Sequence, residues 1–330
     1  MLRLNHALLM WLVLVFCGVA QATPVGSGQG RTTPQHAAVA SVSYRTVEID
    51  GVKIFYREAG SATAPAILLL HGFPASSFMY RDLIGKLADR YHVIAPDYPG
   101  FGYSDAPEAA TFGYTFDHLA DVVSKLTDAI GLERYALYMQ DYGGPVGFRL
   151  ATRHPEKVTA LIVQNANAYA EGLPDSFWTP VRTLWKTPSD ENYRMIEQAA
   201  MSDAALQWNY TIGVKDPTRV DPDSWALQHE LLNRPGNKGI MLALLYDYRS
   251  NLTHYAEWQA YFRAHKPPML IAWGANDPIF PPTGARCYLR DLPKAELHLL
   301  DTGHFALEDR SDEIAQLIRD FLPRALAAAH

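Results

Sequence analysis

Short apolar runs that end in turn residues alternate with helical patterns along most of this chain. The runs AILLL and HVIAP flank a helical pattern at residues 76–90, and YALYMQ and VTALIVQ flank another at 143–154. Parallel strands need a crossover of about a dozen residues or more, which a helix of this length supplies. The alternation therefore predicts an α/β fold with a doubly wound, mostly parallel sheet. An Asp50-Gly51 turn predicts a β-hairpin ahead of it.

The strand–helix alternation stops between residues 167 and 265. This segment is rich in Trp and Tyr, and its periodicity is mainly helical, most clearly at 187–208 and 238–265. Strand signals then return. The pattern predicts a sheet domain formed by residues 43–166 and 266–330, with a helical cap, or lid, inserted at 167–265. Such a cap would cover the carboxyl edge of the sheet, where open α/β folds bind their ligands.

The N-terminal residues combine a positive charge with an apolar stretch. Arg3 precedes an apolar segment at 7–20, and Ala20-Gln21-Ala22 has the small residues of a cleavage site. The segment is short for a membrane span. It predicts a signal peptide at 1–22 and a secreted or periplasmic protein, with an uncleaved N-terminal anchor as the alternative. Small and polar residues at 23–42 predict a flexible leader.

Composition argues against several classes of partner. The 330 residues carry a formal net charge of -6, so no basic surface predicts binding to nucleic acid. No later segment is apolar and long enough to predict stable membrane insertion after cleavage. Cleavage would remove Cys17 and leave Cys287 without a partner, so the fold cannot depend on an internal disulfide.

One buried strand is predicted to end at an acidic residue. The apolar run YALYMQ stops at Asp141, and Gly143 and Gly144 follow at the start of a helix. Burying a carboxylate is costly unless a neighbouring group pairs with it. A strand, a tight turn with a polar residue at its apex and a helix form a nucleophile elbow. An Asp in this place can also be a simple helix N-cap.

Four further motifs follow the order of a known family. LLLHGFP and APDYPGFGYSD end two early strands, WGANDPIFPP places Asp277 after a late strand, and DTGHFALED places His304 after the last. Together with the elbow at Asp141, these motifs resemble the α/β-hydrolase superfamily, from Ser43 to the C-terminal helix. An aspartate in place of serine resembles the branch that contains epoxide hydrolases and haloalkane dehalogenases.

The resemblance implies a role for each motif residue. Asp141 would attack a saturated carbon and form an enzyme ester, and His304 would take a proton from the water that hydrolyses this ester. Asp277 would orient the imidazole and stabilise its cation. The backbone N–H groups of Phe73 and Tyr142 would form the oxyanion hole.

Other polar residues are not preferred as catalytic or metal-binding residues. Asn165 ends a strand and is an alternative orienter of the histidine, but an amide cannot stabilise imidazolium by charge, so Asp277 is preferred. His229, His254 and His265 have no ligand spacing. We therefore expect no metal and no dissociable cofactor.

The electrophile is the least determined part of the prediction. Haloalkane dehalogenases usually hold the halide with a Trp after the nucleophile and an Asn after His-Gly, and Tyr142 and Phe73 occupy these places. Epoxide hydrolases use cap tyrosines to donate to the epoxide oxygen, and YDYRSN resembles their motif, which makes Tyr248 the best candidate. Tyr210 and Tyr169 are candidates for a second donor. Aromatic packing within the cap is the alternative role for Tyr248.

The predicted function is hydrolysis of small apolar epoxides to vicinal diols, with water as the second substrate. The aromatic residues of the cap predict an apolar substrate pocket; they include Trp178, Trp185, Trp208 and Tyr210. The alternatives are a haloalkane dehalogenase-like hydrolase and a ligand-binding member of the fold with little turnover. The sequence is compatible with a monomer and leaves the oligomeric state open.

Overall fold

A computed structural model of the chain describes residues 41–327. The predicted signal peptide at 1–22 and nearly all of the predicted leader at 23–42 fall outside these residues. Within the described range, no helix has both the length and the apolar character needed to cross a bilayer.

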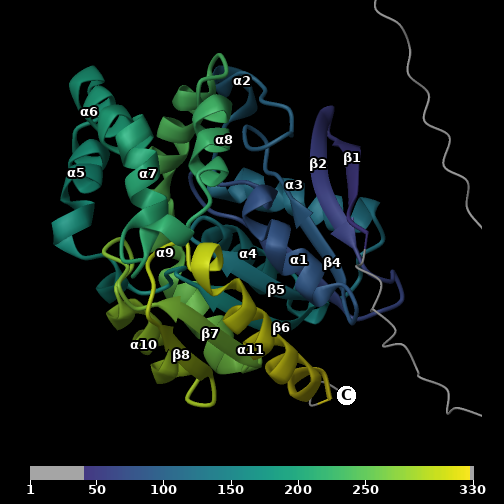
Figure 1. The fold of residues 1–330 in the computed structure, drawn as a ribbon. Coiled ribbons are helices and arrows are strands. Elements are labelled where there is room, and N and C mark those ends of the chain that lie inside the picture. The colour runs from purple at the N-terminus through teal and green to yellow at the C-terminus, as the bar shows by residue number, and fades with distance from the viewer. Residues whose placement is uncertain (1–40, 328–330) are drawn as a thin grey trace, which may run out of the picture. The chain divides into compact units, whose positions relative to one another are not determined.

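An eight-stranded sheet forms the centre of the described chain (Figure 1). Strand β2 is antiparallel to β1 and β4, and the other neighbours pair in parallel, which confirms the mostly parallel sheet. The strands lie in the spatial order β1 (Ser43–Ile49), β2 (Val52–Ala59), β4 (His92–Pro96), β3 (Ala66–Leu70), β5 (Tyr135–Gln140), β6 (Val158–Gln164), β7 (Met269–Gly274) and β8 (Glu296–Leu300).

The predicted hairpin joins β1 and β2. Ile49 pairs with Val52, and the two turn residues, Asp50 and Gly51, have φ values of 51° and 81°. Two successive positive φ values belong to the tight turn that matches the twist of paired strands, and Asp-Gly is a favoured sequence for it. The local chemistry thus specifies this connection.

Helices cover both faces of the sheet because successive strand residues point to opposite sides. In β3, Leu68 and Leu70 pack into one core with α3 and α4, and Ile67 and Leu69 pack into another with α1 and α11. The helices outside the cap are η1 (Ser77–Tyr80), α1 (Arg81–Leu87), α2 (Ala109–Phe112), α3 (Phe116–Ala129), α4 (Gly143–Arg153), η2 (Pro155–Lys157), α10 (Pro282–Asp291) and α11 (Leu307–Ala327).

The chain between β6 and β7 is helical and gathers at one side of the sheet (upper left in Figure 1). It contains η3 (Ala170–Gly172), α5 (Asp175–Lys186), α6 (Asp190–Met201), α7 (Asp203–Thr211), η4 (Pro217–Arg219), α8 (Asp223–Leu232) and α9 (Asn237–His265). The single helical pattern predicted at 187–208 forms two helices, since Ser202 ends α6 and caps α7 by accepting a hydrogen bond from the Ala205 N–H.

Candidate active site

Asp141 lies at the apex of a sharp turn between β5 and α4. Its φ is 48°, a left-handed conformation that few residues other than glycine adopt. The turn brings α4 so close to β3 that a Cβ on Gly143 would lie 2.0 Å from the carbonyl oxygen of Leu70. The glycine is therefore required for this geometry, and the strained turn presents the Asp141 carboxylate at the end of the sheet.

His304 and Asp277 meet at the same edge, as the sequence predicts. The imidazole Nδ1 of His304 lies 2.8 Å from Oδ2 of Asp277, and its Nε2 lies 3.9 Å from Oδ2 of Asp141. All three side chains are buried. Because a carboxylate only accepts hydrogen bonds, Asp277 places the Nδ1 proton of His304 and leaves Nε2 facing Asp141.

Asn165, the alternative orienter, supports Asp277 and does not contact the histidine. Its Nδ2 donates to Asp277 Oδ2 at 2.8 Å, and its Oδ1 accepts from the Gly274 N–H at 2.8 Å. Its φ is 43°, so a second left-handed residue ends the strand next to the elbow. Asn165 therefore fixes the carboxylate that in turn orients His304.

The backbone of the loop after β3 contacts the Asp141 carboxylate. The Phe73 N–H donates to Asp141 Oδ1 at 2.6 Å. His71 supports this loop: its Nδ1 lies 3.0 Å from the Gly72 carbonyl oxygen, and its Nε2 accepts from the Tyr98 N–H at 3.3 Å. Burial lowers the pKa of His71 to about 4, which keeps the ring neutral and suited to this structural role.

The surroundings shift both reactive groups away from their ordinary pKa. Burial raises the pKa of Asp141 to about 6, although His304 and the backbone N–H groups of Phe73 and Tyr142 favour its ionised form. Burial alone would lower the pKa of His304, but the charges of Asp277 and Asp141 outweigh it and raise that pKa. Two groups with shifted pKa values thus lie close together in one buried site, which is typical of active sites.

Two polar residues that the sequence analysis did not single out also lie here. Gln140, directly before Asp141, places its Nε2 at 3.0 Å from Nε2 of His304. Asn209 on α7 is buried, and its Oδ1 has no hydrogen-bond partner among the described residues. Gln140 could have been found from the sequence, because it directly precedes Asp141. No sequence signal shows which face of α7 points toward the site, so Asn209 could not.

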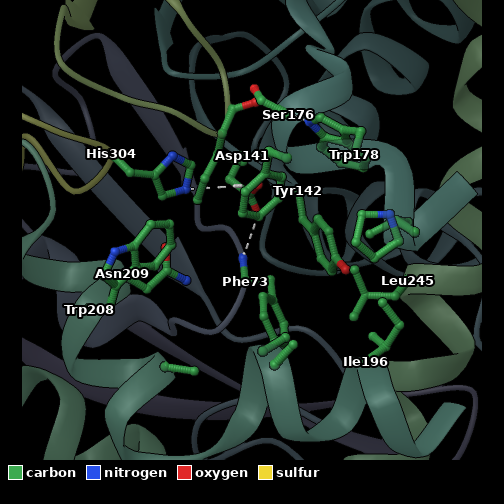
Figure 2. Close-up of a pocket in the computed structure, with 17 residues that line it drawn as sticks. Phe73, Asp141, Tyr142, Ser176, Trp178, Ile196, Trp208, Asn209, Leu245 and His304 are labelled. Atoms are coloured by element: carbon green, nitrogen blue, oxygen red, sulfur yellow. Dashed lines mark hydrogen bonds and ion pairs between the residues drawn. The ribbon is translucent and has the colours of Figure 1, made fainter. Parts of the chain in front are cut away.

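A cavity of about 240 Å³ opens onto Asp141 and His304. Figure 2 shows Asp141 between His304 and the Phe73 backbone, with Trp208 and Asn209 on the His304 side. Most of the wall is apolar; the lining residues are Phe73, Asp141, Tyr142, Ser176, Phe177, Trp178, Pro180, Val181, Ile196, Ala199, Ala200, Ala205, Trp208, Asn209, Leu245, Ile279 and His304. Such a cavity suits a small, largely apolar molecule.

Comparison with known proteins identifies the fold family. The family described as alpha/beta hydrolase fold matches residues 65–208 and 215–311. The chain belongs to this family. The α/β hydrolase is 45% identical to an uncharacterised hydrolase of Saccharomyces cerevisiae over 82% of this chain and 93% of the yeast protein. It is 31% identical to haloalkane dehalogenase 2 of Mycobacterium tuberculosis over 81% of this chain and 90% of that protein.

Two further proteins, one with a different named activity and one with a solved structure, are also similar to this chain. A cis-3-alkyl-4-alkyloxetan-2-one decarboxylase of Shewanella oneidensis is 28% identical over 83% of this chain and 86% of its own. The solved structure of haloalkane dehalogenase DbeA from Bradyrhizobium elkani superposes with a TM-score of 0.73 at 22% identity, covering 87% of this hydrolase and all (100%) of DbeA. This superposition supports the α/β-hydrolase fold.

The hydrolase places several predicted substrate-binding residues outside the cavity. Trp178 lines it as predicted, but Trp185 does not and donates its indole N–H to the Leu245 carbonyl oxygen at 2.9 Å. Tyr210 is buried against Phe305, with the two ring centroids 4.0 Å apart. The Tyr169 hydroxyl donates to Asp291 Oδ2 at 2.7 Å. None of these three side chains lines the cavity, because each has a packing or hydrogen-bonding partner elsewhere, and their role in substrate binding stays a prediction.

Tyr248 has an intermediate position. It does not line the cavity, but its ring packs against two residues that do, with centroid distances of 4.8 Å to Trp178 and 6.0 Å to Tyr142. Its hydroxyl is buried beside that of Tyr255, but no group among the described residues meets it with hydrogen-bond geometry. A buried hydroxyl without a partner is costly, so a role beyond packing stays open. No group of three or more His, Cys, Asp or Glu in the described chain could hold a metal ion.

Proposed function

We propose that this α/β hydrolase uses Asp141 as a nucleophile and opens small apolar epoxides to vicinal diols. The observation that carries the proposal is a carboxylate at the elbow, 3.9 Å from the imidazole of an Asp277–His304 pair. A carboxylate at this position needs no base to activate it, unlike a serine hydroxyl. It leaves His304 free for a second step.

The reaction would have two stages. In the first, an oxygen of Asp141 bonds to an epoxide carbon, the C–O bond of the ring breaks, and the ring oxygen takes a proton from the hydroxyl of Tyr248. In the second, His304 takes a proton from water, whose oxygen bonds to the ester carbon of Asp141. The N–H groups of Phe73 and Tyr142 stabilise the resulting oxyanion. As this intermediate collapses, the ester bond breaks, the leaving diol oxygen takes the proton held by His304, and the carboxyl group formed on Asp141 loses its own proton to restore Tyr248. One oxygen of the solvent stays in Asp141.

The choice of an epoxide rests on the donors around the cavity. The indole N–H of Trp178 donates to the Ile279 carbonyl oxygen at 3.0 Å, so it is not free to hold a halide. The residue after the nucleophile is Tyr142, which has no indole N–H to offer. Tyr248 is the proposed donor to the epoxide oxygen, and a change in the cap would have to bring its unpartnered hydroxyl to the cavity.

Dehalogenation is the second candidate, because haloalkane dehalogenase 2 is a relative at 31% identity. Styrene oxide and phenethyl bromide have the same carbon skeleton and separate the two reactions. We expect diol from the first and little bromide release from the second. Predominant bromide release would favour dehalogenation, and turnover of neither would favour a ligand-binding protein.

A single-turnover reaction in heavy-oxygen water tests the nucleophile. The ester mechanism predicts that the first diol carries no heavy oxygen and that the label enters Asp141, located by peptide mass spectrometry. In the His304→Gln variant, an adduct with the mass of styrene oxide should accumulate on the intact protein. Label in the first diol, with none in Asp141, would contradict covalent catalysis.

The Tyr248→Phe variant tests the proposed donor. It removes only a hydroxyl without a partner, so the free energy of unfolding should change by less than about 1 kcal/mol. Ester formation from styrene oxide should fall at least about 100-fold, in line with loss of a general acid. Unchanged ester formation would leave Tyr248 with a packing role only.

We also propose that the protein is exported, on the basis of the signal-like residues 1–22. N-terminal sequencing of the protein recovered from the periplasm or medium should begin at Thr23. Recovery of the full-length chain with the cell membrane would instead support the uncleaved anchor.

A further inference from the structure

The side chain of Gln140 lies closer to Nε2 of His304 than the Asp141 carboxylate does. Its Nε2 lies 3.0 Å from His304 Nε2, whereas Asp141 Oδ2 lies 3.9 Å away. Both Gln140 and His304 are fully buried. The proposed reaction needs His304 Nε2 to accept a proton from water, so a group that already occupies this nitrogen must influence the step.

The direction of the hydrogen bond follows from the other ring nitrogen. His304 Nδ1 lies 2.8 Å from Asp277 Oδ2, so it carries the proton that this carboxylate accepts. A neutral imidazole then has its lone pair on Nε2, which accepts from the amide N–H of Gln140. The Oε1 of Gln140 has no partner among the described residues, so the imidazole is the group that orients the amide.

The charges around His304 oppose its function as a base. The titratable groups that face the ring are Asp277 on the Nδ1 side and Asp141 on the Nε2 side. Phe280 and Phe305 cover the ring and carry no charge. Two carboxylates favour the imidazolium, and a protonated His304 cannot take a proton from water. An amide N–H that points at Nε2 would be repelled by a second proton there.

The position of Gln140 is closely restricted. It ends β5 at the register position opposite Gln164 in β6. Its Oε1 packs against the Cα of Gly72, where an added Cβ would lie 2.4 Å from that oxygen. Strand, neighbouring loop and burial together leave the amide facing the imidazole.

We propose that Gln140 is a positioning residue that disfavours protonation of His304 Nε2, so that the imidazole acts as a base at a lower pH than its two neighbouring carboxylates would otherwise allow. The inference rests on the proposed function for its catalytic consequence, but not for its effect on the titration of His304. Gln140 would act on the reaction only through its hydrogen bond to His304.

Two variants test this role, and the second is expected to raise the pKa of His304 more than the first. Gln140→Met keeps a similar size and removes the N–H donor, so the pKa of His304 should rise by about one pH unit, the worth of one hydrogen bond. Gln140→Glu replaces the donor with an acceptor, and the rise should be about two pH units or more. Heteronuclear NMR of the imidazole nitrogens measures both shifts without any substrate.

The matching control is Gln164→Met. Gln164 donates to the backbone carbonyl oxygen of His304 at 3.2 Å and does not contact the ring. This variant removes a buried amide at the paired position of the next strand, so it reproduces the structural disturbance. The titration of the imidazole should remain as in the wild-type protein.

Rapid-kinetic measurements with styrene oxide give the catalytic consequence. Ester formation should change by less than about threefold in Gln140→Met, and the pH at which ester hydrolysis becomes half-maximal should rise with the pKa of His304. At neutral pH, Gln140→Glu should hydrolyse the ester about 100-fold more slowly, so the ester accumulates.

The outcomes separate this inference from the proposed function. An unchanged or lower pKa of His304 in Gln140→Met overturns the role of Gln140, whatever the enzyme hydrolyses. The same holds if Gln164→Met shifts the titration equally. If the NMR shifts occur but no ester forms from styrene oxide, Gln140 retains its role and the proposed function fails.

Discussion

Among single residues, Asp141 has the clearest link between burial and stability, because its ionisable carboxyl group is buried. Its pKa of about 6, against an ordinary value of 3.8, means that the folded protein holds a proton over a pH range in which the unfolded chain has lost it. Stability therefore falls as the pH rises from about 4 to about 6 through this group. The proposed nucleophile thus lowers the stability of the fold, which is common at active sites.

The Asp141→Asn variant should make this cost measurable. A pKa difference of this size corresponds to about 3 kcal/mol, so the variant should be more stable than the wild-type protein above pH 6 by up to this amount. Urea unfolding at several pH values should show the advantage growing between about pH 4 and pH 6. A variant that is less stable at every pH would contradict the cost of burying this charge. Ester formation should be abolished.

The two stages of the proposed reaction should also differ in pH dependence. Ester formation needs ionised Asp141, so kcat/KM should fall below about pH 6. Hydrolysis needs neutral His304, whose pKa is raised above its ordinary value of 6.5 by Asp277 and Asp141. Between these limits the ester should accumulate, which rapid acid quenching and intact-mass measurement would detect. A single pH limb shared by both stages would contradict these assignments.

At the level of secondary-structure elements, the packing of β5 against α4 depends on one glycine. Met139 points its sulfur toward α4, where a Cβ on Gly147 would lie 2.3 Å from it. The bulky residue in the strand is thus matched by a missing side chain in the helix. The side chain of Met139 therefore fits between β5 and α4 only because residue 147 has no side chain.

A double-mutant cycle tests this match. Gly147→Ala alone should lower the free energy of unfolding by about 1–3 kcal/mol through overpacking, and Met139→Ala alone should cost about 2–5 kcal/mol. Together they should cost at least about 1 kcal/mol less than their sum, because the smaller strand residue makes room. Gly85→Ala in α1, where the added Cβ would meet no atom within 4 Å apart from its own helix backbone and chain neighbours, is the control and should be neutral or stabilising. Additive costs would exclude the match.

The elements that the sequence predicts well have local causes. Asp50-Gly51 fixes the first turn through its backbone preferences, and the glycines after Asp141 permit the elbow. The order of strand ends brings Asp277 and His304 to Asp141 because parallel strands share one carboxyl edge. Cap side chains have no such constraint. In α9, Leu245 lines the cavity, whereas Tyr248, one turn later, packs against the lining residue Trp178. Helical periodicity alone does not show which turn of a helix lies over Asp141.

At the scale of the described molecule, Arg149 joins the sheet domain to the cap. It is buried on α4, and its Nη1 donates to Asn251 Oδ1 of α9 at 2.7 Å. Its Nε donates to Asp117 Oδ1 of α3 at 3.0 Å. The planar guanidinium therefore ties three helices together, a geometry that other side chains do not provide.

Arg149→Met should lower the free energy of unfolding by about 2–5 kcal/mol, since it leaves the buried Oδ1 of Asn251 and the carbonyl oxygen of Pro145 without their donor. Arg153→Met is the control on the same helix: Arg153 also pairs with Asp117 but is about a third exposed, at 35%, so its loss should cost less than about 1 kcal/mol. Urea unfolding measures both. Equal losses would show that the link to α9 does not stabilise the fold.

The cavity draws its two kinds of surface from different parts of the chain. The reactive groups come from strand ends, whereas a continuous stretch from Ser176 to Asn209 supplies most of the apolar wall. Changes within that stretch can alter the shape offered to a substrate without moving Asp141 or His304. Proteins with this fold could thus acquire new substrates through substitutions in α5, α6 and α7, while the residues at the strand ends stay the same.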